Sequence, residues 1–398
     1  MRVLFLHNAF PGQYRHLAAA LARDPANQVV FATHRAEGSL PGVRVETYAS
    51  ARAVRNDCHP YLRWMEGAVL TGQAVWRLGQ RLKAEGFAPD VVCAHAGWGP
   101  GLYARELFPA ARHVGYFEWF YGGDASDTQF LGHQLSDDDR CRLATRNAAL
   151  LMDLAQADVA LTPTRFQRDR FPAKLRPLLT VLHDGVDTGF FRPQPARPAI
   201  PGCDLSAADQ VVTYATRGME PYRGFPQFMR AAALLLAERP GLHVVIAGED
   251  QVYYGERLPD GDSWKRRMLA ELPEMDRSRL HFVGTLPAAS YRDLLALSSA
   301  HVYLTAPFVL SWSLLDALAC GCAVVGSDSE PVREVLEDGV TGLLADFFSP
   351  EEIAGKVAHI LDDAALAAHL RGNARKVAVE RFSLDRLLPR HMTLLRGN

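Results

Sequence analysis

The strongest indication of the fold lies in residues 302–328, whose sequence is VYLTAPFVLSWSLLDALACGCAVVGSD. A buried strand is predicted over 302–304, and it breaks at Pro307. A helix is predicted from about Ser311 to Cys320, and Gly321 ends it. Because a second apolar run follows over 323–326, the stretch predicts one βαβ unit. The ligand edge of such a unit lies where its first strand ends.

The start of this predicted helix is a run of small and polar residues, Ser311-Trp312-Ser313, ahead of an apolar face. Free backbone N–H groups and the positive end of the helix dipole favour an anion at such a terminus, phosphate above all. A capped helix in an α/β core gives the same pattern without a ligand. This stretch alone leaves both interpretations open.

The composition of the 398-residue chain is that of a soluble globular protein with two domains or so. With 48% hydrophobic and 22% charged residues and a net charge of −2, it has no basic field for nucleic acid. No apolar run approaches the length of a membrane span, and the start MRVLFLHNAF does not fit a signal peptide. The six cysteines show no CxxC pair or zinc-type spacing, so we expect a cytoplasmic protein without a metal site.

Short apolar strands alternate with helices along the whole chain, which predicts mostly parallel sheets covered on both faces. We expect two Rossmann-like α/β domains that face a cleft. The predicted domains are 1–189 and 210–398, and a Pro-rich linker without periodicity joins them over 190–209. Predicted strands are 3–6, 28–33, 43–48, 90–95, 113–117, 159–161 and 179–182, then 211–215, 243–247, 281–283, 302–304 and 323–326. A long helix is predicted over 136–157, and the tail over 350–395 is helical.

Two doubly wound halves are also typical of dehydrogenases, but the nicotinamide fingerprint is missing. The first strand-to-helix turn has only Gly12 where G-x-G-x-x-G is needed, and the second strand ends without an acid for the ribose. The equivalent turn of the second half, TRGMEPYRG over 216–224, carries Arg217 and Arg223 instead.

Two guanidinium groups beside a strand-to-helix turn can hold a diphosphate by bidentate hydrogen bonds. Their charge would also stabilise a nucleoside diphosphate as it leaves. Alternatively, Arg217 and Arg223 are surface residues that pair with acids such as Glu220 or Glu249.

Several motifs in this order resemble the retaining glycosyltransferases of family 4, also called group 1, over nearly the whole chain. VLHDGVD at 181–187 is similar to the segment that closes the family's N-terminal domain. Arg217 with Arg223-Gly224 is similar to its phosphate turn, with Arg in place of Lys, and residues 316–321 and 334–342 match two further motifs. HNAFPGQYRHL, YATRGMEPYRGF, YLTAPFVLSWSLLDALA and PVREVLEDGVTGLL resemble a bacterial subgroup with a PFVLSW variant.

The resemblance implies the GT-B fold, with C-terminal helices that could cross back to the N-terminal domain. It implies that Arg217 and Arg223 are catalytic, because they hold the diphosphate. It also assigns residues to donor binding. These are Gly12, Gly284, Ser311, Trp312, Ser313, Asp316 for the ribose, and Glu334.

The sequence departs from the family's pattern at two places. The Glu-x7-Glu pair falls on Phe308 and Asp316, so a phenyl ring replaces the acid that contacts donor-sugar hydroxyls. The acceptor-side His falls on Glu118, which could hydrogen-bond a sugar hydroxyl or act as a catalytic base, or could simply pair with an arginine. His95 and Trp98 are further acceptor-side candidates, although a lone His at a strand end is more often structural.

The function implied is transfer of a hexosyl-type sugar from a nucleotide diphospho-sugar to a glycan, lipid-linked or other hydroxyl acceptor. The resemblance implies same-face attack, in which the leaving phosphate accepts the proton, and no metal or cofactor. Domain closure about the linker would exclude water. A non-catalytic GT-B partner, favoured by Phe308 and Asp316, and a nucleotide-sugar epimerase are the alternatives.

A basic run around Phe166 and Phe171 could contact anionic lipid at the inner face of a membrane. A solvated surface is the ordinary explanation of such a run. Its basic members are Arg165, Arg168, Arg170, Lys174 and Arg176.

Overall fold

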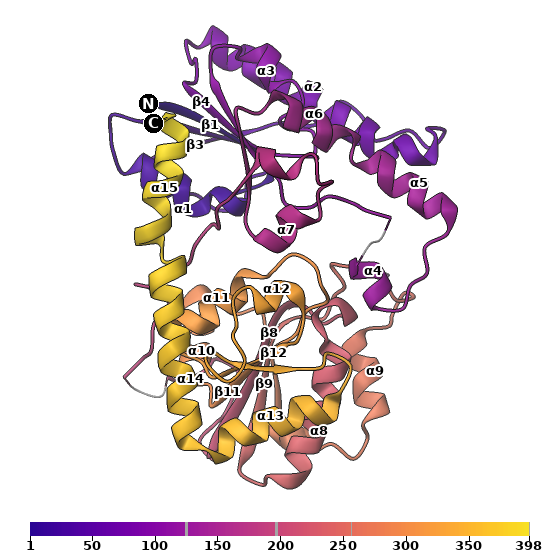
Figure 1. The fold of residues 1–398 in the computed structure, drawn as a ribbon, viewed down its shortest axis with the longest axis vertical. Coiled ribbons are helices and arrows are strands. Elements are labelled where there is room, and N and C mark those ends of the chain that lie inside the picture. Colours follow the sequence, from indigo (N-terminus) through magenta and orange to yellow (C-terminus); the bar gives the residue numbers. More distant parts are fainter. Residues whose placement is uncertain (124–125, 196–197, 256, 398) are drawn as a thin grey trace. The chain divides into compact units, whose positions relative to one another are not determined.

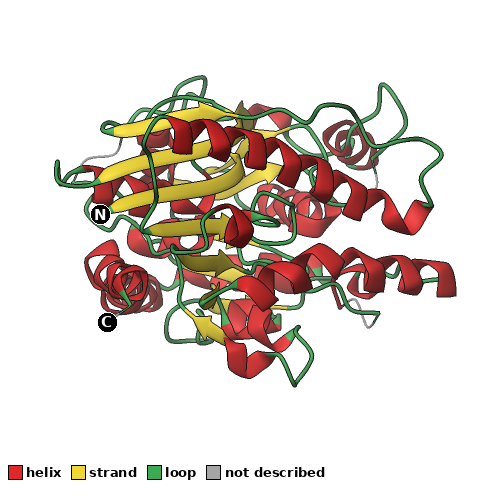
Figure 2. Ribbon diagram, turned by 90° about the horizontal axis from the view of Figure 1, so that it is seen from above, coloured by secondary structure: helices red, strands yellow, loops and turns green. Residues whose placement is uncertain are grey.

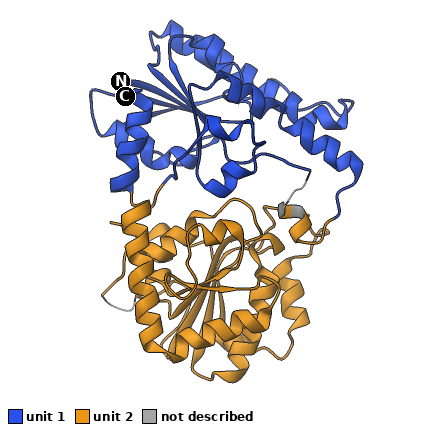
Figure 3. Cartoon of the chain, viewed as in Figure 1, with its two compact units in different colours: residues 1–125, 134–184, 384–398 blue, residues 126–133, 185–383 orange. Residues whose placement is uncertain are grey.

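The computed structural model describes residues 1–123, 126–195, 198–255 and 257–397. It divides into two compact units (Figure 3). Unit 1 comprises Met1–Ala125, Gln134–Asp184 and Leu384–Asn398, and unit 2 comprises Ser126–His133 and Gly185–Ser383. Each unit is a Rossmann-like α/β domain around one parallel sheet, as the sequence predicts (Figure 1).

Unit 1 contains a seven-stranded sheet in the order β3-β2-β1-β4-β5-β6-β7, and all seven predicted strands are present. Every pair of neighbours is parallel. Apolar runs such as VVCA at 91–94 of β4 supply both faces of the sheet, and a separate hydrophobic cluster covers each face. The strands are β1 Arg2–Ala9, β2 Gln28–Arg35, β3 Val43–Thr47, β4 Val91–His95, β5 Arg112–Tyr116, β6 Val159–Thr162 and β7 Leu179–Val181.

The helices of unit 1 differ from the prediction at Asn147. This residue divides the predicted helix over 136–157 into α5 and α6, because its buried amide bonds both backbone groups of Tyr121, at 2.9 and 2.7 Å. Its ψ is −6°, away from the helical value. The helices are α1 Arg15–Ala22, α2 Arg63–Ala84, α3 Ala104–Leu107, α5 Asp137–Arg146, α6 Ala148–Gln156, α7 Arg165–Asp169 and α15 Leu384–Arg396.

The C-terminal helix α15 belongs to unit 1, whereas the predicted domain 210–398 grouped it with the second half. Leu387 and Leu395 are buried in the unit 1 core, and His391 Nε2 lies 3.0 Å from the carbonyl oxygen of His183. These apolar contacts explain why the C-terminal helix packs in unit 1, although the residues before it belong to unit 2. Figure 1 shows α15 beside α1.

Unit 2 contains a six-stranded parallel sheet in the order β10-β9-β8-β11-β12-β13. Helices flank its strands. Figure 2 shows the helices of the chain in red and its strands in yellow. Five strands agree with the prediction, and the three-residue β13 was not predicted. The strands are β8 Gln210–Gly218, β9 Leu242–Glu249, β10 Leu280–Gly284, β11 Ala300–Tyr303, β12 Val324–Ser327 and β13 Leu343–Ala345.

The helices of unit 2 follow the predicted alternation, and the helical tail is confirmed. A short helix, α4, also belongs to this unit, where Phe130 packs on Phe347 and Phe348. The helices are α4 Ser126–Phe130, α8 Phe225–Glu238, α9 Trp264–Glu271, α10 Ala288–Leu297, α11 Trp312–Ala319, α12 Glu330–Arg333, α13 Pro350–Asp362 and α14 Ala364–Val377.

The predicted linker over 190–209 lies in unit 2, and the boundary between the units falls at Asp184 and Gly185. Arg375 of α14 fixes the chain just before and at the start of this segment, with hydrogen bonds to the carbonyls of Thr188 and Phe191. Residues 196–197 of the predicted linker lie outside the described residues.

The strand orders place a switch point in each sheet. In unit 2 the chain turns one way from β8 and the other way from β11, and in unit 1 the same occurs at β1 and β4. Ligands of doubly wound sheets bind beyond the carboxyl ends of the strands at such points. In the described part of the chain, no helix combines the length and the apolar character that crossing a membrane requires.

Candidate functional site

Arg223 is held at the switch point of unit 2 by a buried hydrogen bond. Its Nη1 donates to Thr305 Oγ1 at 2.8 Å and lies 3.3 Å from the Val309 carbonyl oxygen. Thr305 follows β11, so this bond joins the turn after β8 to the loop before α11. The residue is 8% exposed, which keeps its charge in a medium of low dielectric.

Gly224 allows this close approach of the two loops. Its φ is 66°, and a Cβ there would lie 2.5 Å from Leu304 Cβ. Any other residue would therefore strain the backbone and push the loops apart.

Arg217 and Arg223 each contact a tyrosine ring of the loop that follows β9. The Arg217 Cζ atom is 4.0 Å from the centroid of Tyr253, and the Arg223 Cζ atom is 5.1 Å from that of Tyr254. Cation–π contacts hold a guanidinium in place without neutralising its charge. Within the described residues neither arginine lies in an ion pair with a carboxylate, although the charge of both acts to lower the pKa of Glu220.

Glu220 and Glu249, the acids that could have paired with these arginines, are engaged otherwise. Glu220 is fully buried, and its Oε2 accepts from the N–H groups of Tyr253 and Tyr254, both at 2.7 Å. Burial raises the pKa of Glu220, although those N–H groups and the arginines oppose the shift. Glu249 accepts from the Tyr253 hydroxyl. The tyrosine loop is therefore tied to the arginine turn.

The start of α11 offers fewer donors than the sequence predicts. The Ser311 N–H donates to the Tyr303 hydroxyl at 2.9 Å, and the Ser313 N–H lies 3.4 Å from Ser311 Oγ, its helix-capping acceptor. Trp312 is 45% exposed, and the half-buried Asp316 follows one turn later on the same helix. The N–H groups of Ser311 and Ser313 are thus already engaged within the chain.

Phe308 belongs to an aromatic cluster. Its ring packs edge-on against Tyr254 at 5.4 Å and against Tyr222 at 6.2 Å between centroids. The Tyr222 hydroxyl is hydrogen-bonded to Asp127, and Tyr254 is the ring that Arg223 contacts. Aromatic surface therefore stands where the resemblance would place a carboxylate.

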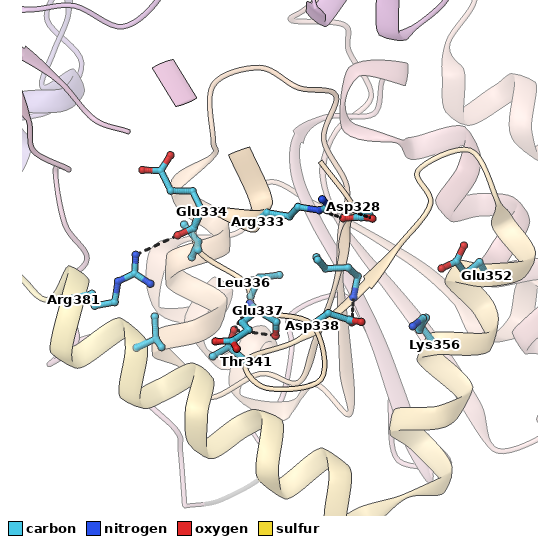
Figure 4. Close-up of a pocket in the computed structure, with 13 residues that line it drawn as sticks. Asp328, Arg333, Glu334, Leu336, Glu337, Asp338, Thr341, Glu352, Lys356 and Arg381 are labelled. Atoms are coloured by element: carbon cyan, nitrogen blue, oxygen red, sulfur yellow. Dashed lines mark hydrogen bonds and ion pairs between the residues drawn. The ribbon is translucent and has the colours of Figure 1, made fainter. Parts of the chain in front are cut away.

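Gly284 and Glu334 are the remaining donor-site candidates, and the Thr285 hydroxyl next to Gly284 donates to Glu249 at 3.3 Å. Gly284 ends β10, and a Cβ there would meet open space. Glu334 lines a cavity of about 650 Å³, and its carbonyl oxygen accepts from Arg381 (Figure 4). Neither Arg217 nor Arg223 is among the described residues that line this cavity.

A chain of hydrogen bonds runs along the carboxyl edge of the unit 1 sheet. His7 Nδ1 accepts from the Ala9 N–H, so its Nε2 carries the proton that is donated to Gln13 Oε1 at 2.7 Å. Gln13 Nε2 then donates to Glu118 Oε1 at 3.0 Å. The other oxygen of Glu118 lies 3.7 Å from His95 Nε2. Glu118 thus pairs with an amide and an imidazole rather than an arginine.

The electrostatics of this edge keep Glu118 ionised. Burial acts to raise its pKa, but His95 and the hydrogen bond from Gln13 outweigh burial and leave the pKa below its usual value. Burial, together with His95, lowers the pKa of His7 to about 3, so His7 is a neutral donor at physiological pH. A carboxylate that is 27% exposed on its side chain is left to accept a further hydrogen bond.

The structure of unit 1 explains why a glycine stands at position 12. Its φ is 48°, and a Cβ would lie 2.7 Å from the His7 ring. The glycine therefore makes room for the imidazole that begins the hydrogen-bond chain.

His95 lies beside Glu118, and Trp98 lies beside His95. His95 ends β4 and is 5% exposed, and its Nε2 has no hydrogen-bond partner among the described residues. The rings of His95 and Trp98 are 6.4 Å apart. Asp153 is buried below them, and burial raises its pKa to about 7 against the opposing Gly97 N–H.

Sequence reasoning missed several residues that complete these groups. Gln13, His7 and Thr305 sit at strand ends or in the following loops, which was the available signal. No sequence signal marked the buried acids Glu220 and Asp153, because an acid in a loop or helix is usually solvated. Within the described ranges, no three His, Cys, Asp or Glu side chains are arranged to hold a metal ion.

The basic run departs from the pattern expected of a membrane-contacting surface. Phe166 and Phe171 are buried at 6% and 0% exposure. Arg176 bonds the carbonyls of Asp169 and Phe171, and Arg168 pairs with Asp169. Leu178 is an exposed apolar side chain next to this run.

Two family models match the chain. The glycosyl transferase family 4 group matches residues 25–191, and the glycosyl transferases group 1 match residues 206–377. D-inositol 3-phosphate glycosyltransferase of Thermobispora bispora is 30% identical over 214 residues, which are 50% of this chain and 46% of that protein. The enzyme of the same name from Mycobacterium bovis is 31% identical over 208 residues, 52% and 40% of the two chains. The chain thus spans less than half the length of these curated relatives.

Solved structures share the architecture of both units. HepE of Anabaena, solved with UDP and glucose, has a TM-score of 0.69 at 17% identity over 100% of both chains. Sucrose-phosphate synthase of Thermosynechococcus elongatus has a TM-score of 0.73 at 18% identity, over 100% of this chain and 98% of that one. At such identities the likeness establishes the fold, which is GT-B.

Proposed function

Because the chain belongs to the group 1 glycosyltransferases of family 4, we infer that it transfers a hexosyl-type sugar from a nucleotide diphospho-sugar to a hydroxyl acceptor with retention. Synthesis of a bacterial surface glycan or glycoconjugate is the role we assign to it. The observation that carries the proposal is the anchored guanidinium of Arg223, with Arg217 on the same turn, at the switch point of unit 2.

The two arginines suit a diphosphate leaving group. Negative charge grows on the leaving phosphate as the sugar bond breaks, and fixed positive charge in a partly dry site stabilises it. Arg223 is already ordered by Thr305, so little side-chain freedom is lost on binding. Asp316 would hold the ribose, and the N-terminus of α11 would add its dipole.

Names of similar proteins support a nucleotide-sugar donor. HepE was solved with UDP-glucose and with UDP, and the relatives act on D-inositol 3-phosphate by name. Retention would follow from same-face attack, in which the leaving phosphate takes the acceptor's proton. Glu118 would then accept a hydrogen bond from the acceptor and orient it.

A donor panel tests this proposal. Thermal shifts with UDP-, GDP- and dTDP-sugars find the nucleotide, and transfer assays with the stabilising donor follow release of nucleotide and the anomeric configuration of the product. We expect nucleotide-dependent stabilisation and a product that keeps the donor's configuration.

The two rival functions predict different results in the same panel. A non-catalytic partner, which the aromatic environment of Phe308 favours, would show no nucleotide stabilisation. An epimerase would yield a sugar isomer without release of nucleotide. An inverted product would contradict retention alone.

Membrane contact through the basic run stays a prediction. Because its two phenylalanines are buried, the contact would rest on Leu178 and the basic side chains. Flotation with anionic liposomes checks it, and absence of the protein from the floating fraction would contradict it.

A further inference from the structure

Trp98 has an exposed aromatic ring, and both backbone groups of the preceding residue, Gly97, are hydrogen-bonded. The Gly97 N–H donates to the buried Asp153 at 2.7 Å, and the Gly97 carbonyl accepts from Trp64 Nε1 at 3.1 Å. The ring of Trp98 is nevertheless 40% exposed. A large apolar side chain that is fixed but uncovered is a ready binding surface, because binding costs it little freedom.

The ring of Trp98 packs against a stack of two aromatic rings and a guanidinium group. Trp64 lies 4.7 Å from Trp98 between centroids, and the Arg146 guanidinium lies 3.8 Å from the centroids of both Trp64 and Tyr121. These contacts hold Trp64 between a ring and a cation. All four residues belong to unit 1.

Two polar side chains, His95 and Glu118, lie near the exposed ring. The imidazole of His95 lies 6.4 Å from Trp98 between centroids, and its buried Nε2 has no hydrogen-bond partner among the described residues. The carboxylate of Glu118 lies 3.7 Å from that nitrogen. A ligand for this place needs an apolar face for the indole and hydroxyl groups at its edge, and a pyranose ring has both.

The charge of the edge selects against an anionic ligand. Glu118 is ionised at neutral pH, and a phosphate beside it would meet like charge. The nearby guanidinium of Arg146 is covered on both faces by Trp64 and Tyr121. The relatives named for D-inositol 3-phosphate take an anionic acceptor, and this edge does not suit one.

We propose that Trp98 is the stacking surface for an uncharged sugar ring of the acceptor, with His95 and Glu118 bonding its hydroxyls. This assignment rests on the proposed glycosyl transfer and names its acceptor class. It makes Trp98 a residue that determines specificity.

Saturation-transfer NMR on the full chain, with UDP present, tests the assignment. The probes are the methyl pyranosides of glucose, galactose and mannose, with D-inositol 3-phosphate as the anionic comparison. We expect saturation of sugar ring protons in the wild type, about tenfold weaker binding in Trp98→Ala, and retention of most binding in Trp98→Phe. Leu178→Ala, at another exposed apolar residue of unit 1, should match the wild type.

The assignment is overturned if no pyranoside binds, if Trp98→Ala binds them as the wild type does, or if the inositol phosphate binds better through Trp98. Circular dichroism of each variant verifies that it is folded. Thermal stabilisation by UDP, measured on the same samples, tests the donor proposal separately, because Trp98 lies in unit 1 and the arginine turn in unit 2.

Discussion

The Arg223 guanidinium donates to the Thr305 hydroxyl at 2.8 Å across 82 positions of sequence. This bond unites the two loops that flank the switch point of unit 2. It fixes a buried cation at the carboxyl edge of the sheet, where a doubly wound fold binds its ligand. The proposed binding of the donor diphosphate depends on this relationship.

Thr305→Val should weaken catalysis without unfolding the protein. The substitution keeps the shape of the side chain but removes the nearer of the two acceptors of Arg223, so kcat/KM should fall by about tenfold, or about 1.4 kcal/mol. Steady-state kinetics with the identified donor measure it. Thr145→Val removes a helix-surface hydroxyl of α5 and should leave kcat/KM unchanged. Equal kinetics for both variants would contradict the anchoring role.

Gly224→Ala should destabilise unit 2, because both the positive φ and the contact with Leu304 oppose a Cβ. The conformational term alone costs about 1–2 kcal/mol. Thermal unfolding should show a clear drop in Tm. Gly355→Ala in α13 meets open space and should instead stabilise the chain by about 0.5–1 kcal/mol. A Tm rise in both variants would refute the strain at Gly224.

Glu118→Gln should lower kcat/KM by about tenfold or more while leaving UDP affinity unchanged. The amide keeps the size of the side chain but loses the charge that accepts the acceptor's hydroxyl. Glu85→Gln, at a surface ion pair with Arg44, is the control and should behave as the wild type. Unchanged turnover in Glu118→Gln would make this acid a structural residue.

Asp153→Asn should change stability in a pH-dependent manner. Burial raises the pKa of Asp153 to about 7 in the folded protein, above that of the unfolded chain. The folded state therefore favours the proton, and stability is lost as pH rises toward and past 7. Asparagine avoids that loss, so the gain in Tm over the wild type should be larger at about pH 8.5 than at about pH 5.5.

Asp158 provides a control of opposite sign. The His113 N–H and Arg105 outweigh burial and lower the pKa of Asp158, so this acid stabilises the fold above its unfolded pKa. Asp158→Asn should therefore lower Tm more at neutral than at acid pH. The same pH trend in both variants would contradict the assigned shift of Asp153.

The strands and their order of appearance follow from sequence, because a run such as VVCA at 91–94 in β4 is apolar throughout and short. The three-residue β13 was not predicted, because the pattern of Leu343–Ala345 is too short to distinguish from the loop around it. The break between α5 and α6 at Asn147 was not predicted either. It depends on hydrogen bonds to Tyr121, which lies 26 residues away.

The site could be predicted as residue types at strand ends, but not as pairs. Arg217 and Arg223 were proposed as site residues because they lie on a strand-to-helix turn and match the family's phosphate turn, and Glu118 because it falls where the family has its acceptor-side His. Their partners were not found, because the Gln13–Glu118 bond spans 105 positions and no local pattern encodes it. The hydrogen bonds of Glu220 to the tyrosine loop also required the structure, because no local pattern shows which groups this carboxylate accepts from.

Titration calorimetry of nucleoside diphosphates tests the central claim most directly. UDP, GDP and dTDP are titrated into the wild type, and the tightest one into the Arg217→Ala/Arg223→Ala double variant. Arg230→Ala, at an exposed ion pair of α8 with Glu271, is the matched control. The account predicts that the double variant loses affinity by about a hundredfold or more and that Arg230→Ala binds as the wild type does. Equal affinity in the double variant and the wild type would contradict the assignment of the diphosphate to this turn.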